Sequence, residues 1–125
     1  VFAKTLHGDM RKHPLAYFFV ASLLVSGCRY KVLDGPEPMV NVVQHNERFS
    51  VNLPESHIKK EMWTVQDGYD TAIVKRLNEV WHGEEKGVDF NFRAIKTGTT
   101  KLAFIKRVYQ DTVESVNYLV KITDN

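Results

Sequence analysis

The sequence has a single cysteine, Cys28, among its 125 residues. The chain beyond it therefore has no thiol for a disulfide, for nucleophilic catalysis or for a cysteine-ligated zinc ion. No apolar run approaches the roughly 20 residues that a permanent transmembrane helix needs. The net charge of +2 arises from Lys4, Arg11 and Lys12 against Asp9, so the charges beyond Cys28 balance. Without a basic excess, nucleic acid is not an expected partner.

The residue types that carry out catalysis are also sparse and scattered. The histidines after the apolar run are His45, His57 and His82. They lie in separate regions without the spacing of a zinc site. The neighbours Ser56 and His57 do not make a catalytic triad, because adjacent loop side chains need not meet. Phosphate-binding and nucleotide-binding motifs are missing. We therefore predict no enzyme, no metal, no cofactor and no small-molecule substrate.

The first part of the chain has the layout of a secretory signal. Met10 is a possible start, and a short basic segment at residues 11–13 is followed by about a dozen mostly apolar residues at 14–25. The four residues Val25-Ser26-Gly27-Cys28 resemble a bacterial lipobox, in which the cysteine is acylated and becomes the mature N-terminus. Residues 10–27 are then a lipoprotein signal peptide. We assign no role to residues 1–9.

The lipobox resemblance implies a membrane anchor at Cys28, and more than one acyl chain is needed for a stable one. Arg29 follows the cysteine where some lipoproteins have Asp, which implies the bacterial outer membrane, facing the periplasm. Residues 28–38 are expected to form the anchor and a short linker that includes LDGPEPM at 33–39. Residues 39–125 are expected to form one domain.

Alternating apolar and polar residues dominate this domain and predict half-buried β-strands. The alternating segments are 48–54, 88–98, 100–109 and 114–122, and shorter strands are expected at 39–43 and 62–65. Turn signals recur about every ten residues, which is typical of a β-sandwich. The predicted core contains Phe49, Val51, Leu53, Phe90, Phe92, Leu102, Phe104, Tyr118 and Val120, with Trp63 also inside.

One segment, residues 71–82, gives conflicting signals. Its apolar residues are Ile73, Val74, Leu77, Val80 and Trp81, a helical spacing. Its β-branched residues and its surroundings favour a strand. We predict a strand here.

The order of these features resembles the chagasin family, inhibitors of papain-like cysteine peptidases with an immunoglobulin-like fold. The resemblance covers about residues 40–123. It lies in Leu53-Pro54 followed by Trp63, in Gly83 and Gly87 before the Phe90 and Phe92 strand, and in Gly98 before Arg107-Val108-Tyr109. It implies an all-β, immunoglobulin-like antiparallel sandwich that binds a peptidase cleft through three loops at one end.

The resemblance places the contacts in loops 55–61, 82–87 and 107–114. The residues that these loops offer are Glu55, Ser56, His57, Ile58, Lys59, Lys60, Trp81, His82, Gly83, Gly87, Arg107, Val108 and Tyr109. The first loop has ESHIKKE in place of the family's Asn-Pro-Thr-Thr-Gly signature, and Val108 stands where the family has proline. A less rigid loop binds with a larger entropic cost. We therefore expect weak inhibition of papain itself and tighter binding to a peptidase with a matching cleft.

Each of these residues also has an ordinary structural explanation. Ile58, Lys59 and Lys60 are more often plain surface than contact residues. Trp81 and Tyr109 suit either a contact or the edge of the core. The glycines suit a hairpin with positive φ, and Glu84-Glu85 suits a polar turn. The competing hypothesis is a non-inhibitory immunoglobulin-like envelope lipoprotein that binds another protein as an accessory module.

The lipid anchor gives the first testable prediction. Cys28→Ser removes the thiol that acylation needs, so the protein should leave the membrane fraction or remain unprocessed. Membrane fractionation and gel mobility of the wild type and the variant measure this. Identical fractionation and mobility of the two proteins would contradict the anchor.

Overall fold

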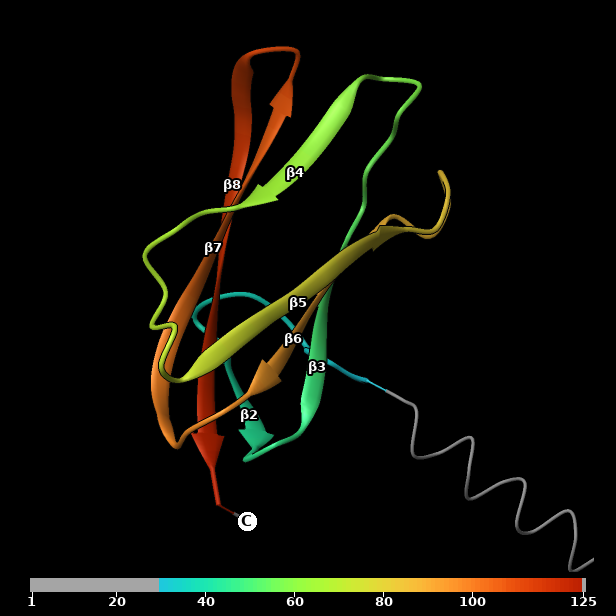
Figure 1. Cartoon of the computed structure of the whole chain (residues 1–125). Helices are drawn as coiled ribbons and strands as arrows, with labels where there is room; N and C mark the ends of the chain where they lie inside the picture. The colour runs from blue at the N-terminus through green and yellow to red at the C-terminus, as the bar shows by residue number, and fades with distance from the viewer. Residues whose placement is uncertain (1–29, 125) are drawn as a thin grey trace, which may run out of the picture.

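The computed structural model describes residues 30–124, and within them β-strands form two sheets (Figure 1). The strands are β1 (Lys31–Val32), β2 (Val40–Gln44), β3 (Arg48–Leu53), β4 (Glu61–Val65), β5 (Val74–Trp81), β6 (Val88–Ala94), β7 (Gly98–Val108) and β8 (Asp111–Thr123). Each predicted strand is present. The predicted leader and Cys28 lie outside the described residues. No helix in residues 30–124 is long and apolar enough to cross a membrane.

The two sheets have the strand orders β1-β3-β6-β5 and β2-β8-β7-β4. We call them sheet A and sheet B. The pairs β3–β6, β5–β6, β4–β7 and β7–β8 are antiparallel, as expected. The pairs β1–β3 and β2–β8 are parallel, which differs from a purely antiparallel sandwich. No hairpin connects either parallel pair, so nothing imposes the antiparallel direction on these edge strands.

The inward faces of the sheets form one core. All nine residues predicted to lie inside are buried, and so is Trp63. Phe104 of sheet B connects the layers: its ring lies 5.1 Å from the ring of Phe90 in sheet A and 5.8 Å from that of Tyr118. Among the described residues the buried cluster extends from Leu33 to Ile122 and includes residues of both sheets.

Strand β5 explains the conflicting pattern in segment 71–82. Its pairing with β6 shifts register between Arg76 and Asn78, so Leu77 is an extra residue in the strand. Such a bulge breaks the two-residue alternation. Beyond Val74 every residue of β5 is exposed, since β5 is the free edge of sheet A. The apolar residues at helical spacing therefore do not share one buried face.

The expected linker contacts the sandwich instead of extending away from it. Leu33 is buried and its N–H donates to the Ser50 carbonyl. The amide of Asn41 is 2% exposed; its Oδ1 accepts from the N–H of Asp34 at 2.8 Å, and its Nδ2 donates to the carbonyls of Gly35 and Leu119. A buried amide with its hydrogen bonds made fixes the local backbone firmly. Residues 31–35 therefore belong to the folded domain.

The core gives the second prediction. Phe104→Ala removes the ring that contacts both sheets, and truncation of a buried Phe costs about 3–5 kcal/mol. Denaturant titration should show this loss in the free energy of unfolding. Val113→Ala, at a side chain that is 54% exposed, is the control and should change stability by less than about 0.5 kcal/mol. Equal effects of the two substitutions would contradict the described core.

Candidate functional site

Three loops meet at one end of the sandwich, which we call the loop end (Figure 1). Strands β3, β5 and β7 run toward this end, and β4, β6 and β8 run away from it. The pairings Leu53–Val88 and Trp81–Val88 in sheet A, and Val108–Asp111 in sheet B, place the strand ends together. The connecting loops are residues 54–60, 82–87 and 109–110. The third is much shorter than the expected 107–114, because β7 and β8 continue to a tight hairpin.

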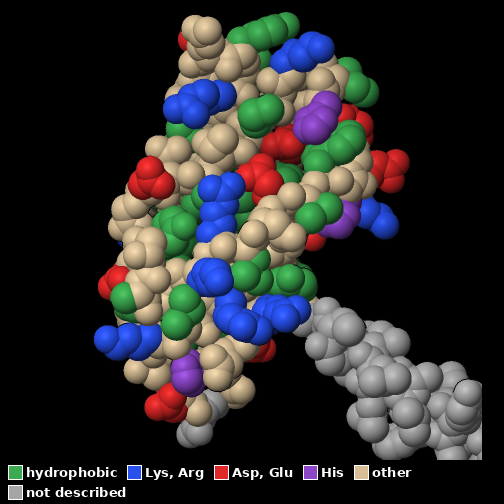
Figure 2. Space-filling model, viewed as in Figure 1, with side chains coloured by type: hydrophobic (Ala, Val, Ile, Leu, Met, Phe, Trp, Pro, Cys, Tyr) green, Lys and Arg blue, Asp and Glu red, His purple; other side chains and the backbone are tan. Residues whose placement is uncertain are grey.

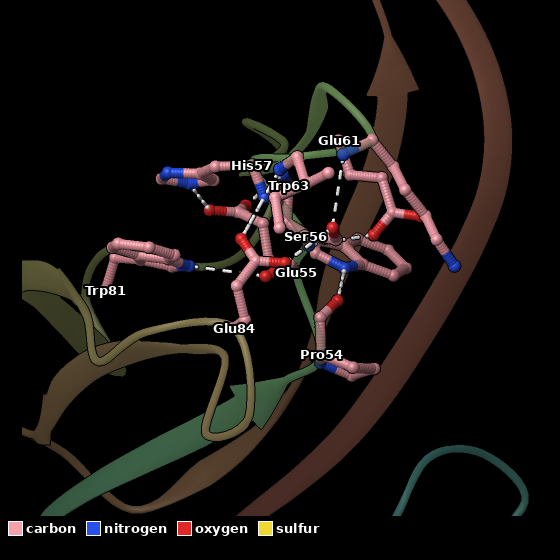
Figure 3. A network of polar contacts seen from close by, with 10 residues as sticks. Pro54, Glu55, Ser56, His57, Glu61, Trp63, Trp81 and Glu84 are labelled. Atoms are coloured by element: carbon pink, nitrogen blue, oxygen red, sulfur yellow. Dashed lines mark hydrogen bonds and ion pairs between the residues drawn. The ribbon is translucent and has the colours of Figure 1, made fainter.

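The carboxylate of Glu55 holds the first loop in place through polar contacts with His57 and Trp63 (Figure 3). This side chain is 6% exposed. One oxygen accepts from the N–H of Trp63 at 2.7 Å, and the other contacts His57 Nε2 at 2.7 Å. The indole of Trp63 donates to the Pro54 carbonyl at 2.8 Å. The buried carboxylate thus joins the loop to the first residues of β4.

Two more carboxylates hold the loop from its sides (Figure 3). Glu84, in the second loop, accepts from the Ser56 hydroxyl and from the N–H of His57, both at 2.7 Å. Glu61 accepts from the N–H of Ser56 at 2.9 Å. The backbone closes on itself as well, since the N–H of Glu61 donates to the Ser56 carbonyl. Lys60 adopts a φ of 64° within this turn.

These hydrogen bonds shift the acidity of both outer carboxylates. The pKa of Glu61 lies below its usual 4.5, first because the N–H of Ser56 donates to it, with Lys106 adding to the effect against partial burial. The pKa of Glu84 is also lowered, first by the Ser56 hydroxyl and then by the N–H groups of His57 and Ile58. Hydrogen bonds that favour the charged form act in this direction. The loop is therefore held best when both groups are ionised.

Trp81 contacts the first loop from the end of β5. Its ring stacks on the imidazole of His57, with centroids 3.8 Å apart and planes 8° from parallel. Its indole N–H donates to the Glu55 carbonyl at 3.3 Å. With 40% exposure, Trp81 is neither core nor a free contact: it supports the first loop.

The second loop depends on Gly87. Its φ is 73°, and a Cβ at this position would lie 2.2 Å from the Leu53 carbonyl oxygen. No other residue fits there without moving β3. Gly83 also has a positive φ, of 108°, but open space surrounds it. The loop closes through the N–H of Gly87 donating to the Gly83 carbonyl, and this closure presents Glu84 to the first loop.

Exposed apolar side chains lie at and beside a pocket between the first loop and the hairpin, which Met62 and Tyr109 line. Ile58 is 79% exposed, Tyr109 77% and Met62 58%. An open pocket of about 320 Å³ is lined by His57, Lys60, Glu61, Met62 and Tyr109. Large exposed aromatic and aliphatic groups around a concave surface are typical of protein-binding sites. Tyr109 does not cap the core, since it lies at the hairpin tip with a φ of 59°.

The remaining predicted residues differ in their relation to this surface. Arg107 and Val108 lie in β7 itself, next to Met62 and Glu61 across the sheet. No hydrogen bond or ion pair joins the Arg107 guanidinium to another residue within 30–124. Lys59 is exposed at the tip of the first loop. His82 is not part of the site: it pairs with Asp89 at 2.9 Å on the outer face of sheet A.

Sequence reasoning missed the residues that give the first loop its shape. Glu84 was assigned to a polar turn, although it bonds to residues 27 and 28 positions earlier. No local pattern reveals such a pairing. Glu61, the last residue of the expected first loop, and Met62 begin β4 and are not among the expected contact residues. One available signal was the density of carboxylates, since Glu55, Glu61 and Glu84 flank a loop whose N–H groups need acceptors.

The site has the character of a binding surface. The Ser56 hydroxyl donates to a carboxylate and contacts no imidazole that could take its proton. In the described part of the chain, no three His, Asp or Glu side chains are placed to hold a metal ion. The surface offers a stiff loop, an exposed aromatic ring and a guanidinium that pairs with no other described residue.

No family model and no curated protein matches the sequence. Two solved structures have a similar fold. The crystal structure of the cysteine protease inhibitor EhICP2 from Entamoeba histolytica has a TM-score of 0.61 and 15% sequence identity, covering 75% of this chain and 95% of the inhibitor. The solution structure of amebosin has a TM-score of 0.58 and 12% identity, covering 76% and 99%. The all-β, immunoglobulin-like sandwich expected from the sequence is confirmed.

The carboxylates give the third prediction. Because the folded-state pKa of Glu84 is lowered, its stabilising effect should be complete above pH 4.5 and disappear as the pH falls through the lowered value. Glu84→Ala should therefore reduce the free energy of unfolding at pH 7, and the difference from the wild type should shrink in acid. Denaturant titration across the pH range measures both.

The neighbouring carboxylate provides the control for this experiment. Glu85 makes no hydrogen bond to the first loop among the described residues, so Glu85→Ala should leave stability nearly unchanged at every pH. Hydrogen exchange at the His57 N–H should quicken in the Glu84 variant alone. A pH-independent loss, or equal losses in the two variants, would refute the assigned role of Glu84.

Proposed function

We propose that this chain is a lipid-anchored inhibitor of papain-like cysteine peptidases that binds the active-site cleft through its loop end. The observation that carries the proposal is the stiff first loop, with Ile58 exposed at its tip and Tyr109 beside it. The fold adds support, because the similar structure of EhICP2 belongs to a cysteine protease inhibitor. The anchor is proposed from the sequence around Cys28.

The geometry of the first loop suits an inhibitor that is not cut. Peptidases hold a substrate extended in the cleft, in the manner of an added β-strand. Residues 56–61 are closed into a turn by their own backbone hydrogen bonds and by three carboxylates. Extending this loop would break most of these bonds at once. It can therefore enter a cleft without offering a scissile bond in the conformation that cleavage needs.

Binding energy in such a surface is expected to concentrate in few side chains. Tyr109 lies at the hairpin tip and is 77% exposed. The Arg107 guanidinium, which pairs with no other described residue, can form two hydrogen bonds to a carboxylate or a carbonyl. The absent Asn-Pro-Thr-Thr-Gly signature leaves Ile58 and His57 as the leading side chains of the first loop. His57 is held by Glu55 and Trp81, so Ile58 is the group that enters a cleft first.

Titration of a soluble form, residues 28–125 with Cys28→Ser, against a panel of papain-like peptidases tests the proposal. Inhibition should be weak for papain and stronger for at least one other peptidase. Tyr109→Ala should weaken that inhibition by about 30-fold, the size of an interface hot spot. Arg107→Lys should also weaken it, because lysine cannot form the paired hydrogen bonds of a guanidinium. The control Ile95→Ala, at an exposed side chain on the opposite end, should have no effect.

A negative panel has a specific meaning. No inhibition of any peptidase, together with capture of an envelope protein that Tyr109→Ala abolishes, would overturn the inhibitor and favour the accessory binding module. Inhibition that survives both loop substitutions would show that a different surface makes the contact.

A further inference from the structure

The outer face of sheet A carries a row of basic side chains at the end opposite the loops. Arg48 pairs with Arg93, and Arg93 pairs with Lys75, so the three lie side by side on β3, β6 and β5. All three are exposed. The guanidinium of Arg48 lies 6.0 Å from the ring centroid of Tyr30, which extends the row to the first described residue. We call Arg48, Arg93 and Lys75 the basic row.

The basic row is expected to lower the stability of the fold when no anion is bound to it. Like charges directly opposite on neighbouring strands destabilise a sheet. Within residues 30–124 no carboxylate forms an ion pair with any of the three. Glu47, the chain neighbour of Arg48, accepts from the Gln44 N–H instead. An unneutralised row of this kind indicates an anionic partner outside the chain.

The position of the row indicates which anion that is. Lys31 pairs with Phe49 at the beginning of β3, so the described chain begins beside the basic row and not at the loop end. Lys and Arg side chains gather on the lower part of the face that Figure 2 shows. Tyr30 and Ile95, the latter 39% exposed, flank the row. Basic side chains together with a tyrosine are typical of proteins that lie on a bilayer surface.

We propose that the basic row lies against a membrane and binds the headgroups of anionic phospholipids. The inference rests on the proposed function in one respect, since acylation of Cys28 would bring Tyr30 to the bilayer. The row then sets the orientation of the domain. Sheet A meets the lipid with its lower part, and the first loop and Tyr109 face away from it.

Vesicle sedimentation tests this without the acyl chains. The protein is residues 28–125 with Cys28→Ser, which contains the buried cluster from Leu33 to Ile122, and far-ultraviolet circular dichroism checks its fold. It should bind vesicles of phosphatidylglycerol and phosphatidylcholine, and bind phosphatidylcholine vesicles far less. Added salt should weaken the binding, because it screens surface charge. Each basic residue near an anionic surface contributes about five-fold, so Arg48→Gln/Lys75→Gln/Arg93→Gln should bind about 100-fold more weakly.

A second triple substitution is the matched control. Lys86→Gln/Lys101→Gln/Lys121→Gln removes the same charge from exposed sites away from the row and should retain most of the binding. Equal losses in both triple variants, equal binding to neutral vesicles, or tighter binding to single-stranded DNA than to anionic vesicles would each overturn the inference. Peptidase titration of the row variant should give unchanged inhibition. The lipid surface and the inhibitor are thus tested by separate measurements.

Discussion

The loop end depends on a simple requirement: the N–H groups of a short, glycine-free loop need acceptors. Glu61 and Glu84 accept from the N–H groups of Ser56 and His57. Glu55 contacts the His57 ring and accepts from the N–H of Trp63 in β4, which ties the loop to that strand. Because these bonds exist before any partner arrives, the entropy of ordering the loop is already lost. The loop also begins with Pro54 and closes through a local turn between Ser56 and Glu61, and the contacts with Glu84 from the second loop add to this stiffness.

Packing of the two sheets explains why most of the fold could be predicted from the sequence. Phe49 and Val51 on β3, and Phe90 and Phe92 on β6, alternate with polar residues and share the buried face. Alternation of this kind is a direct consequence of strand geometry, so it survives in the sequence. Segment 74–81 does not show this alternation. The extra residue at Leu77 interrupts it, and at the free edge of the sheet neither face of the strand beyond Val74 is buried.

The features that could not be predicted are contacts between distant parts of the chain. Glu84 lies beside Ser56, Asn41 donates to the Leu119 carbonyl, and Trp81 stacks on His57. To predict these contacts one must know which strands are neighbours. The hydrophobic periodicity and the turn residues of a sequence do not show this. The basic row is of the same kind: its three members are separated along the chain and become a row only through strand register.

The placement of the two ends has a consequence for how far the domain can act. The chain enters beside the start of β3, and the first loop follows the end of the same strand. Six residues of strand span roughly 20 Å. If the chain is anchored through Cys28 as proposed, the domain is a rigid spacer of fixed height that holds the loop end above the membrane. The loop end would then reach only those membrane-bound partners whose binding sites lie at a similar distance from the membrane. The length of the domain would limit the choice of partner independently of side-chain contacts.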